Sequence, residues 1–167
     1  DRIEALRIAF CPAWESACIA AEVWREPAPQ YSNRFHLFRL ITHLAKYWTA
    51  EQAVQTAKWA MEVNGGMGTL AEFGVERLLR EAMILNIWEG PPHRQILDGI
   101  EVMERKGAHK LLFDHLAPYD ENECEPLQSR VDLFLTLGQE EKETFAEELF
   151  HDFAALAGKA LKQKYVG

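Results

Sequence analysis

The feature that most constrains this chain is a long apolar helical repeat that stops abruptly at glycines. Apolar residues recur at intervals of three and four from Leu37 to Ala60, which predicts one long helix over residues 33–64. Three glycines follow within four residues, at Gly65, Gly66 and Gly68. Glycine has no Cβ atom to disfavour positive φ, so we expect the helix to end here and the chain to turn back.

Helical spacing recurs along the rest of the chain, and we find no strand pattern. Further helices are predicted over residues 2–25, 74–83, 91–106, 127–137 and 139–164, with helix continuing over 109–116 and an acidic loop over 118–126. The predicted fold class is all-α. We expect an up-and-down helical bundle over residues 1–107 and two extra C-terminal helices within residues 108–167, packed on the bundle.

Composition excludes several classes of function. The 167 residues are 48% hydrophobic and 26% charged, as in ordinary soluble domains. No apolar run approaches the roughly 20 residues that span a membrane. The net charge of −8 disfavours nucleic acid as a partner, because binding to a phosphate backbone needs a basic surface.

The cysteines and histidines predict neither a disulfide nor a metal site. Cys11 and Cys18 lie seven residues apart on one predicted helix, too far for a bridge, and Cys124 falls in the predicted acidic loop. His36 and His43 are also seven apart, whereas a helical metal pair prefers four. Reduced thiols favour an intracellular protein, and we expect a cytoplasmic one.

Two short segments are candidates for function. The glycine turn at residues 65–68 is either a helix C-cap or a place where bare backbone N–H groups meet a phosphate or cofactor. Glu89 follows Ile87 and Trp88 and precedes Gly90. It is either an acid near the start of the next helix or a base made stronger by partial desolvation beside its apolar neighbours.

The order of three motifs resembles a known family. Ala-x-Glu-x-x-Gly-Gly-x-Gly at residues 60–68 is followed by Val-Glu-Arg-x-x-Arg-Glu-Ala at 75–82 and by Ile-Trp-Glu-Gly at 87–90. This order is similar to the C-terminal helical domain of acyl-CoA dehydrogenases, above all in their AidB-like branch. The resemblance is strong over residues 45–97, weaker but colinear over 1–44, and vague after Gly107.

The resemblance implies an FAD-dependent acyl-CoA dehydrogenase. Glu89 would be the base that removes the α proton of an acyl-CoA thioester while a hydride leaves for the flavin. Gly65, Gly66 and Gly68 would approach the FAD of an adjacent subunit in a homo-oligomer, and Gly90 would lie beside the flavin. An electron-transfer flavoprotein would accept the electrons. The family's upstream flavin and substrate domains are absent from this chain, so we expect the isolated domain to be inactive.

Two positions depart from the family pattern. Glu62 stands where most members have Gln, and Pro91 stands where the family usually has Thr or Ser. Proline has neither a hydroxyl nor an N–H, so we expect His93 to replace part of the missing cofactor contact. Glu76 and Arg80 lie four residues apart and can form a stabilising surface pair on one helix face, and the resemblance implies that Arg77 and Arg80 help fix the loop that carries Glu89.

Two alternative functions stay open. One is an AidB-like flavoprotein of alkylation defence that contacts nucleic acid. The other is a helical interaction module whose cofactor chemistry has lapsed, which Glu62 and Pro91 favour. The dehydrogenase interpretation requires Glu89 to be half sheltered from water and to face a cleft that a flavin ring can fill.

Overall fold

The computed structural model describes residues 2–166, and every regular element among them is helical, as predicted. Its α-helices are α1 Arg2–Val23, α2 Asn33–Val63, α3 Val75–Ile87, α4 Pro92–Lys106, α5 Ala108–Thr136 and α6 Gln139–Val166. Three short 3-10 helices, η1 Pro29–Tyr31, η2 Gly65–Thr69 and η3 Ala71–Phe73, lie in the connections. None of the described helices is both long and apolar enough to cross a membrane.

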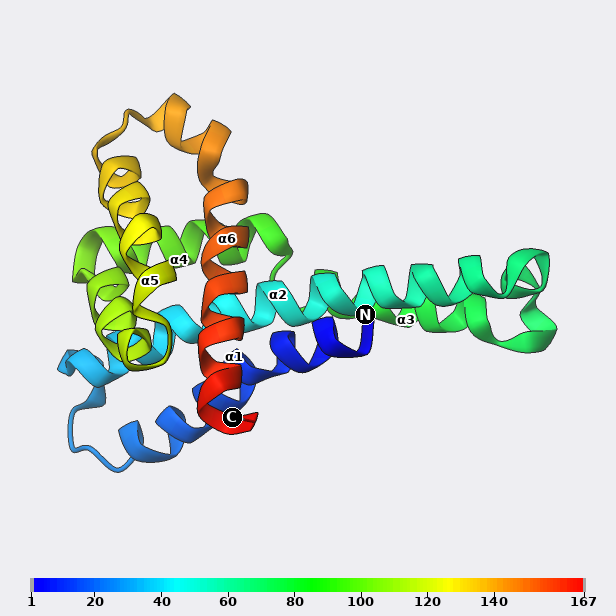
Figure 1. Ribbon diagram of the computed structural model, residues 1–167, viewed down its shortest axis with the longest axis horizontal. Helices are drawn as coiled ribbons and strands as arrows, with labels where there is room; N and C mark the ends of the chain where they lie inside the picture. Colours follow the sequence, from blue (N-terminus) through cyan, green and yellow to red (C-terminus); the bar gives the residue numbers. More distant parts are fainter. Residues whose placement is uncertain (1, 167) are drawn as a thin grey trace.

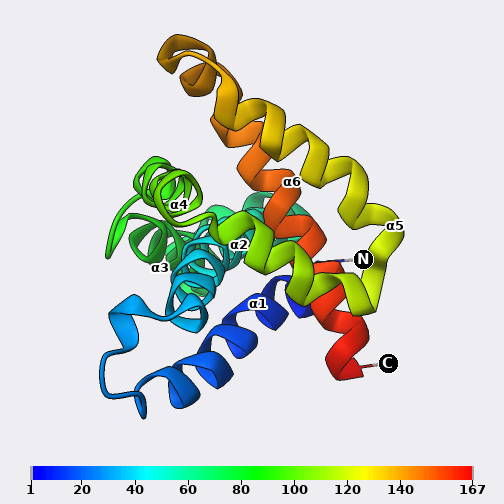
Figure 2. The same ribbon diagram turned by 90° about the vertical axis from the view of Figure 1, so that its left-hand side faces the viewer.

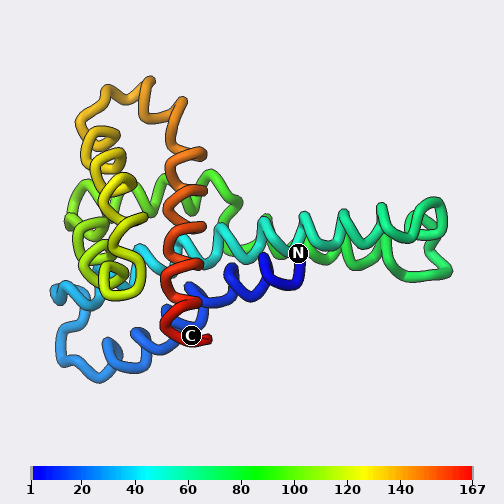
Figure 3. Tube along the Cα trace, viewed as in Figure 1, coloured from blue at the N-terminus to red at the C-terminus, as the bar shows by residue number. Residues whose placement is uncertain are grey.

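Helix α2 is the central element. It contacts α1, α3, α4, α5 and α6. Its start is fixed locally, because the Oγ atom of Ser32 accepts a hydrogen bond from the Phe35 N–H at 3.1 Å. The C-terminal end of α2 extends away from the bundle beside α3, which returns antiparallel to it (Figure 1). The tube in Figure 3 shows this α2–α3 hairpin projecting alone, with residues 65–73 at its tip.

One hydrophobic core lies where the other helices cross α2. Its fully buried side chains include Leu40 and Leu44 of α2, with Phe113 of α5 and Phe153 of α6 stacked at 4.9 Å between ring centroids. Helix α3 contributes little to burial, since Ala82 is its only buried residue. Helix α3 is therefore held mainly by its contact with α2, and α2 is in turn held by the bundle.

The C-terminal part of α5 lies antiparallel to α6 (Figure 2). The predicted loop over 118–126 is wrong, because this region is helical on both sides of a sharp kink at Asp120, where φ is −159° and ψ is 67°, so that α5 consists of two helical segments. Cys124 is 4% exposed and Leu127 is 6% exposed, so burial of this face stabilises helix within a polar sequence. All three cysteines are free thiols, as expected.

Helix α1 packs closely on α6. A Cβ atom at Gly158 would lie 2.8 Å from the backbone oxygen of Ile8 and 2.7 Å from its Cγ2 atom. Only glycine therefore fits here without a shift of backbone. The helix pair is also joined by an ion pair between Glu4 and Lys162.

Candidate functional site

The glycine turn forms the tip of the α2–α3 hairpin. Backbone conformation or packing explains the glycine at two of its three glycine positions. Gly65 adopts φ +56°, which favours glycine. A Cβ atom at Gly68 would lie 2.4 Å from the backbone oxygen of Met61, so packing of the turn on α2 requires glycine there. At Gly66, an added Cβ would meet nothing within 4 Å. No contact within the described chain explains the glycine at position 66.

The turn caps the C-terminal end of α2 and also leaves part of its own backbone exposed to solvent. Helix α2 ends at Val63, and the Asn64 side chain donates to the Ala60 oxygen at 2.8 Å, which caps the last turn. Gly65 and Gly66 are exposed. The C-cap interpretation is therefore confirmed, and the open backbone leaves room for a molecule to approach. The proposed contact with a cofactor stays a prediction.

Glu89 lies in the short loop between α3 and α4, in an uncommon backbone conformation. Its φ is +57°, and it is the one non-glycine residue with positive φ among residues 2–166. Gly90 follows with φ +104°, and α4 then begins at Pro92, as the prolines predict. A left-handed conformation at a non-glycine residue costs free energy, and such residues cluster at functional sites.

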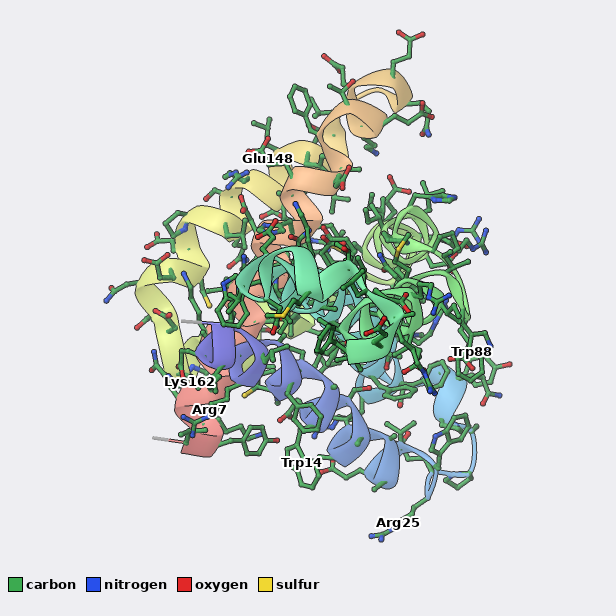
Figure 4. All side chains as sticks on the ribbon, turned by 90° about the vertical axis from the view of Figure 1, so that its right-hand side faces the viewer. Arg7, Trp14, Arg25, Trp88, Glu148 and Lys162 are labelled. Atoms are coloured by element: carbon green, nitrogen blue, oxygen red, sulfur yellow. The ribbon has the colours of Figure 1, made fainter. Side chains whose placement is uncertain are left out.

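The carboxylate of Glu89 is not sheltered by its apolar neighbours. Glu89 is exposed, and Ile87 and Trp88 are 65% and 64% exposed. Figure 4 places Trp88 at the periphery of the molecule. The prediction of partial desolvation is wrong for this chain, because these apolar side chains face solvent instead of packing over the acid. Any shelter for Glu89 must come from groups beyond the described residues.

The glycine turn and Glu89 do not meet within one chain. They lie at opposite ends of α3, whose 13 residues span about 20 Å at the usual rise per residue. The separation is plain in Figure 1, where the turn is at the outer end of the hairpin and the α3–α4 connection is at its base. A single ligand cleft within the described chain therefore does not join the two predicted segments.

Side chains of α2 and α4 hold the Glu89 loop. The Nε2 atom of Gln95 donates to the backbone oxygen of Glu89 at 3.0 Å and lies 3.4 Å from that of Gly90. Its Oε1 atom lies 3.0 Å from Nδ1 of His43 in α2. Lys46, one turn further along α2, donates to the Leu85 oxygen at the end of α3, at 2.8 Å.

Sequence reasoning missed Gln95 and Lys46 and overvalued two arginines. Arg80 pairs with Glu76 at 2.9 Å, as predicted, and Arg77 pairs with Glu81 at 2.7 Å. Both pairs lie within α3, so these hydrogen bonds do not support the expectation that the arginines fix the loop. A signal for Gln95 was present, since it is a polar residue on the buried face of α4.

His93 lies exposed in the first turn of α4, four residues after Glu89. Pro91 precedes the helix with an extended backbone, φ −66° and ψ 168°. Neither residue has a contact that tests the predicted replacement of the family's hydroxyl group, and this role of His93 stays a prediction. No group of three or more potential metal ligands occurs among the described residues.

Comparison with known proteins supports one family. Residues 17–103 match the model of the acyl-CoA dehydrogenase C-terminal domain. The 3-methylmercaptopropionyl-CoA dehydrogenase of Ruegeria pomeroyi is 30% identical over 126 residues, which cover 74% of this chain and 21% of that protein. The AidB protein of Escherichia coli is 36% identical over 75 residues, covering 44% of this chain and 14% of its own length.

A solved structure extends the likeness to the whole chain. The apo form of Bd2924 superposes with a TM-score of 0.77 at 25% identity and covers 98% of this chain and 33% of that one. The fold of α5 and α6 is thus shared as well. The chain spans between 12% and 21% of the length of the curated relatives that it matches. The match over residues 17–103 shows that the chain belongs to the acyl-CoA dehydrogenase family and carries its C-terminal helical domain.

Proposed function

We propose that this chain supplies the catalytic base of an FAD-dependent acyl-CoA dehydrogenase, and that Glu89 is this base. The observation that carries the proposal is the left-handed backbone of Glu89, with φ +57°, at the position where the Ile-Trp-Glu-Gly motif resembles the family's base. Such a conformation persists when surrounding contacts enforce it, as they do at active sites.

The carboxylate of Glu89 takes the α proton of an acyl-CoA thioester and becomes a neutral carboxylic acid. The electron pair of the broken Cα–H bond forms the second bond between Cα and Cβ as a hydride leaves Cβ. FAD, when bound, accepts that hydride. An electron-transfer flavoprotein is the proposed acceptor of the electrons. The proposed substrate is an acyl-CoA, and one relative, the enzyme from Ruegeria pomeroyi, acts on 3-methylmercaptopropionyl-CoA by its name.

The fit of the chain to FAD rests on Gly66. A Cβ atom at this position would meet nothing within 4 Å in the described chain, so no contact within the chain requires glycine there. We infer that the glycine makes room for a molecule outside the chain. Gly65 and Gly66 would offer their backbone to that molecule, while Gly68 keeps the turn packed on α2. Gly90 and His93 would face the flavin beside Glu89.

Two further observations support a homo-oligomer whose subunits complete one another's sites. The glycine turn and Glu89 lie at opposite ends of α3, so the cofactor near the turn would be that of a neighbouring subunit. Ile84, Ile87 and Trp88 around the Glu89 loop are each more than 60% exposed. Residues outside this chain would cover them and give the carboxylate the shelter that a base near neutral pH needs.

The test uses the full-length protein that contains this chain, reconstituted with FAD. Anaerobic bleaching of the flavin by acyl-CoAs of graded chain length would measure the reductive step. Glu89→Gln should slow it by about 10²–10⁴-fold, the usual contribution of a positioned base. Glu148→Gln is a matched control, because Glu148 is an exposed acid on α6, well separated from the loop in Figure 4.

Bleaching by Glu89→Gln at the wild-type rate would remove Glu89 from this role. Absence of bleaching in the wild type, with FAD bound, would instead favour a helical module whose chemistry has lapsed. The paired arginines of α3 and the net charge of −8 give no support to a nucleic-acid partner.

A further inference from the structure

The loop that carries Glu89 contains two consecutive residues in the left-handed region. Glu89 has φ +57° and Gly90 has φ +104°, between Trp88, which is extended, and Pro91. Glycine accepts such a conformation freely, whereas glutamate does not. The backbone at Glu89 therefore needs contacts that hold it in place.

Gln95 provides the direct contact. Its side-chain amide donates to the Glu89 oxygen at 3.0 Å and also approaches the Gly90 oxygen at 3.4 Å. Gln95 is 6% exposed, so its amide is held in a packed position, and its loss would remove the side-chain hydrogen bond to the Glu89 oxygen. A Cβ atom on Gly90 would lie 2.9 Å from Nε2 of Gln95, so the glycine makes room for the amide.

The other end of the amide is fixed by α2. Oε1 of Gln95 lies 3.0 Å from Nδ1 of His43, and because an amide oxygen only accepts, Nδ1 carries the proton in this arrangement. His43 thereby selects the orientation in which Nε2 of Gln95 faces the loop. The chain of contacts runs from the central helix α2, through α4, to the backbone of Glu89.

Lys46 fixes the entry to the loop from the same helix. Its Nζ atom donates to the Leu85 oxygen at 2.8 Å, near the C-terminal end of α3, where a cation is favourable. Burial lowers the pKa of Lys46, and the charge of Glu89 partly offsets this effect. The ammonium group is thus held close enough to Glu89 to interact with its charge.

We propose that Gln95, oriented by His43, is the positioning residue for Glu89, and that its amide holds the left-handed loop backbone from which the carboxylate reaches the substrate. The proposal rests on Glu89 being the base. In this role Gln95 does not contact the substrate and acts by holding the backbone of Glu89. A displacement of about 1 Å at a reacting group can cost about 10²-fold in rate, so removal of this anchor should be visible in the chemical step.

The experiment compares variants of the FAD-loaded full-length protein in the bleaching assay. Gln95→Met removes both ends of the amide at similar length. We expect it to lower the limiting rate of flavin reduction by about 10–100-fold while the substrate concentration at half-saturation and the FAD content stay near wild type. Gln55→Met is the control, because the Gln55 side chain donates to Glu51 within α2 itself.

Gln95→Glu separates the two ends of the amide. A carboxylate can still accept from His43 but cannot donate to the Glu89 oxygen. At neutral pH it should be as slow as Gln95→Met, and its rate relative to wild type should rise at lower pH, where the protonated acid regains a donor. His43, Lys46 and Glu89 lie around this position in both proteins, so each variant rate is compared with the wild-type rate at the same pH.

The two proposals fail separately. If Glu89→Gln bleaches normally, the assigned base is wrong. If Glu89→Gln is inactive but Gln95→Met and Gln95→Glu reduce flavin within about twofold of wild type, the base stands and the positioning role is overturned. If Gln95→Met does not fold, the pH dependence of the Gln95→Glu ratio decides the question, and a flat ratio near one overturns the role.

Discussion

The Nζ atom of Lys164 in α6 lies 2.8 Å from Oε2 of Glu15 in α1, a carboxylate that is 1% exposed. Tyr165 donates its hydroxyl to the same carboxylate, and Nε2 of His115 in α5 lies 2.8 Å from Oε1. This Glu15 cluster joins three helices at one buried charge. Its pairing satisfies both carboxylate oxygens, as burial of an ionised group requires.

Glu15→Gln should destabilise the protein markedly. It removes the charge on which Lys164, His115 and Tyr165 converge, and breaking a buried pair is costly. The Lys164 side chain is 28% exposed and can turn toward water, so we expect a loss of about 2–3 kcal/mol in the free energy of unfolding, below the usual range for fully buried pairs.

Urea unfolding would measure this loss. Glu22→Gln is the control on the same helix, because Glu22 pairs with Arg34 at an exposed site and should contribute less than about 1 kcal/mol. Equal losses for Glu15→Gln and Glu22→Gln would contradict the special role of the buried cluster.

The stability of the protein should also depend on pH through Glu15. Burial alone would raise the pKa of Glu15, but hydrogen bonds from His115, Lys164 and Tyr165 outweigh it and lower the pKa from 4.5 to about 2. The unfolded chain therefore takes up a proton near pH 4.5, while the native carboxylate does so only near pH 2. Between these values the unfolded state binds more protons, so this contribution to stability is complete above pH 4.5 and is lost toward pH 2.

A comparison of wild type with Glu15→Gln isolates this contribution from that of other acids. The difference between their free energies of unfolding should be constant above the upper value and shrink as the pH falls through the interval. A difference that stays constant through the whole interval would show that Glu15 does not cause the pH dependence of stability.

Gly158→Ala should loosen the contact between α1 and α6. The new methyl group would lie 2.8 Å from the Ile8 backbone oxygen, and backbone cannot rotate aside as a side chain can. Overpacking of this kind costs about 1–3 kcal/mol. Thermal unfolding would detect it, and Gly138→Ala provides the comparison, because an added Cβ there meets nothing closer than 3.7 Å. A Gly158→Ala protein as stable as the wild type would show that α1 shifts without cost.

Local signals predicted the helices well. Residues 33–64 were predicted as one helix and α2 spans Asn33–Val63, because a serine cap and a left-handed glycine fix its ends without help from the rest of the fold. Helix α3 runs to Ile87, beyond the predicted residue 83. Its last apolar residues are exposed in this chain, so the rule that apolar residues face the core did not reveal the end of the helix.

The site was less accessible to sequence reasoning, for two physical reasons. The contact between Gln95 and His43 joins residues 52 apart, and only the packing of α4 on α2 brings them together. The exposure of Glu89 does not follow from its neighbours in sequence, because Ile87 and Trp88 do not pack over its side chain. Motif order identified Glu89 and the glycines as candidates, but it did not reveal that Glu89, Gly65 and Gly66 are exposed in the described chain.

Gly66 and Gly68 should respond in opposite ways to the same substitution. Gly68→Ala forces a methyl group against the Met61 backbone and should destabilise the hairpin tip by about 1–3 kcal/mol. The methyl group of Gly66→Ala would meet nothing within 4 Å in the described chain. The free energy of unfolding of this variant should therefore stay within about 0.5 kcal/mol of wild type. In the full-length protein, however, its methyl group would face the proposed FAD, and a clash of similar size would weaken FAD binding by about 5–150-fold.

FAD release on dilution, followed by flavin fluorescence, would measure that weakening, with unfolding of the apoprotein measured in parallel. Wild-type FAD retention in Gly66→Ala would exclude a close approach of cofactor to this glycine. Loss of FAD together with an equal loss of stability would place the role of Gly66 within the chain. Loss of FAD at unchanged stability fits only an approach from outside, since the described residues leave the space beside Gly66 empty.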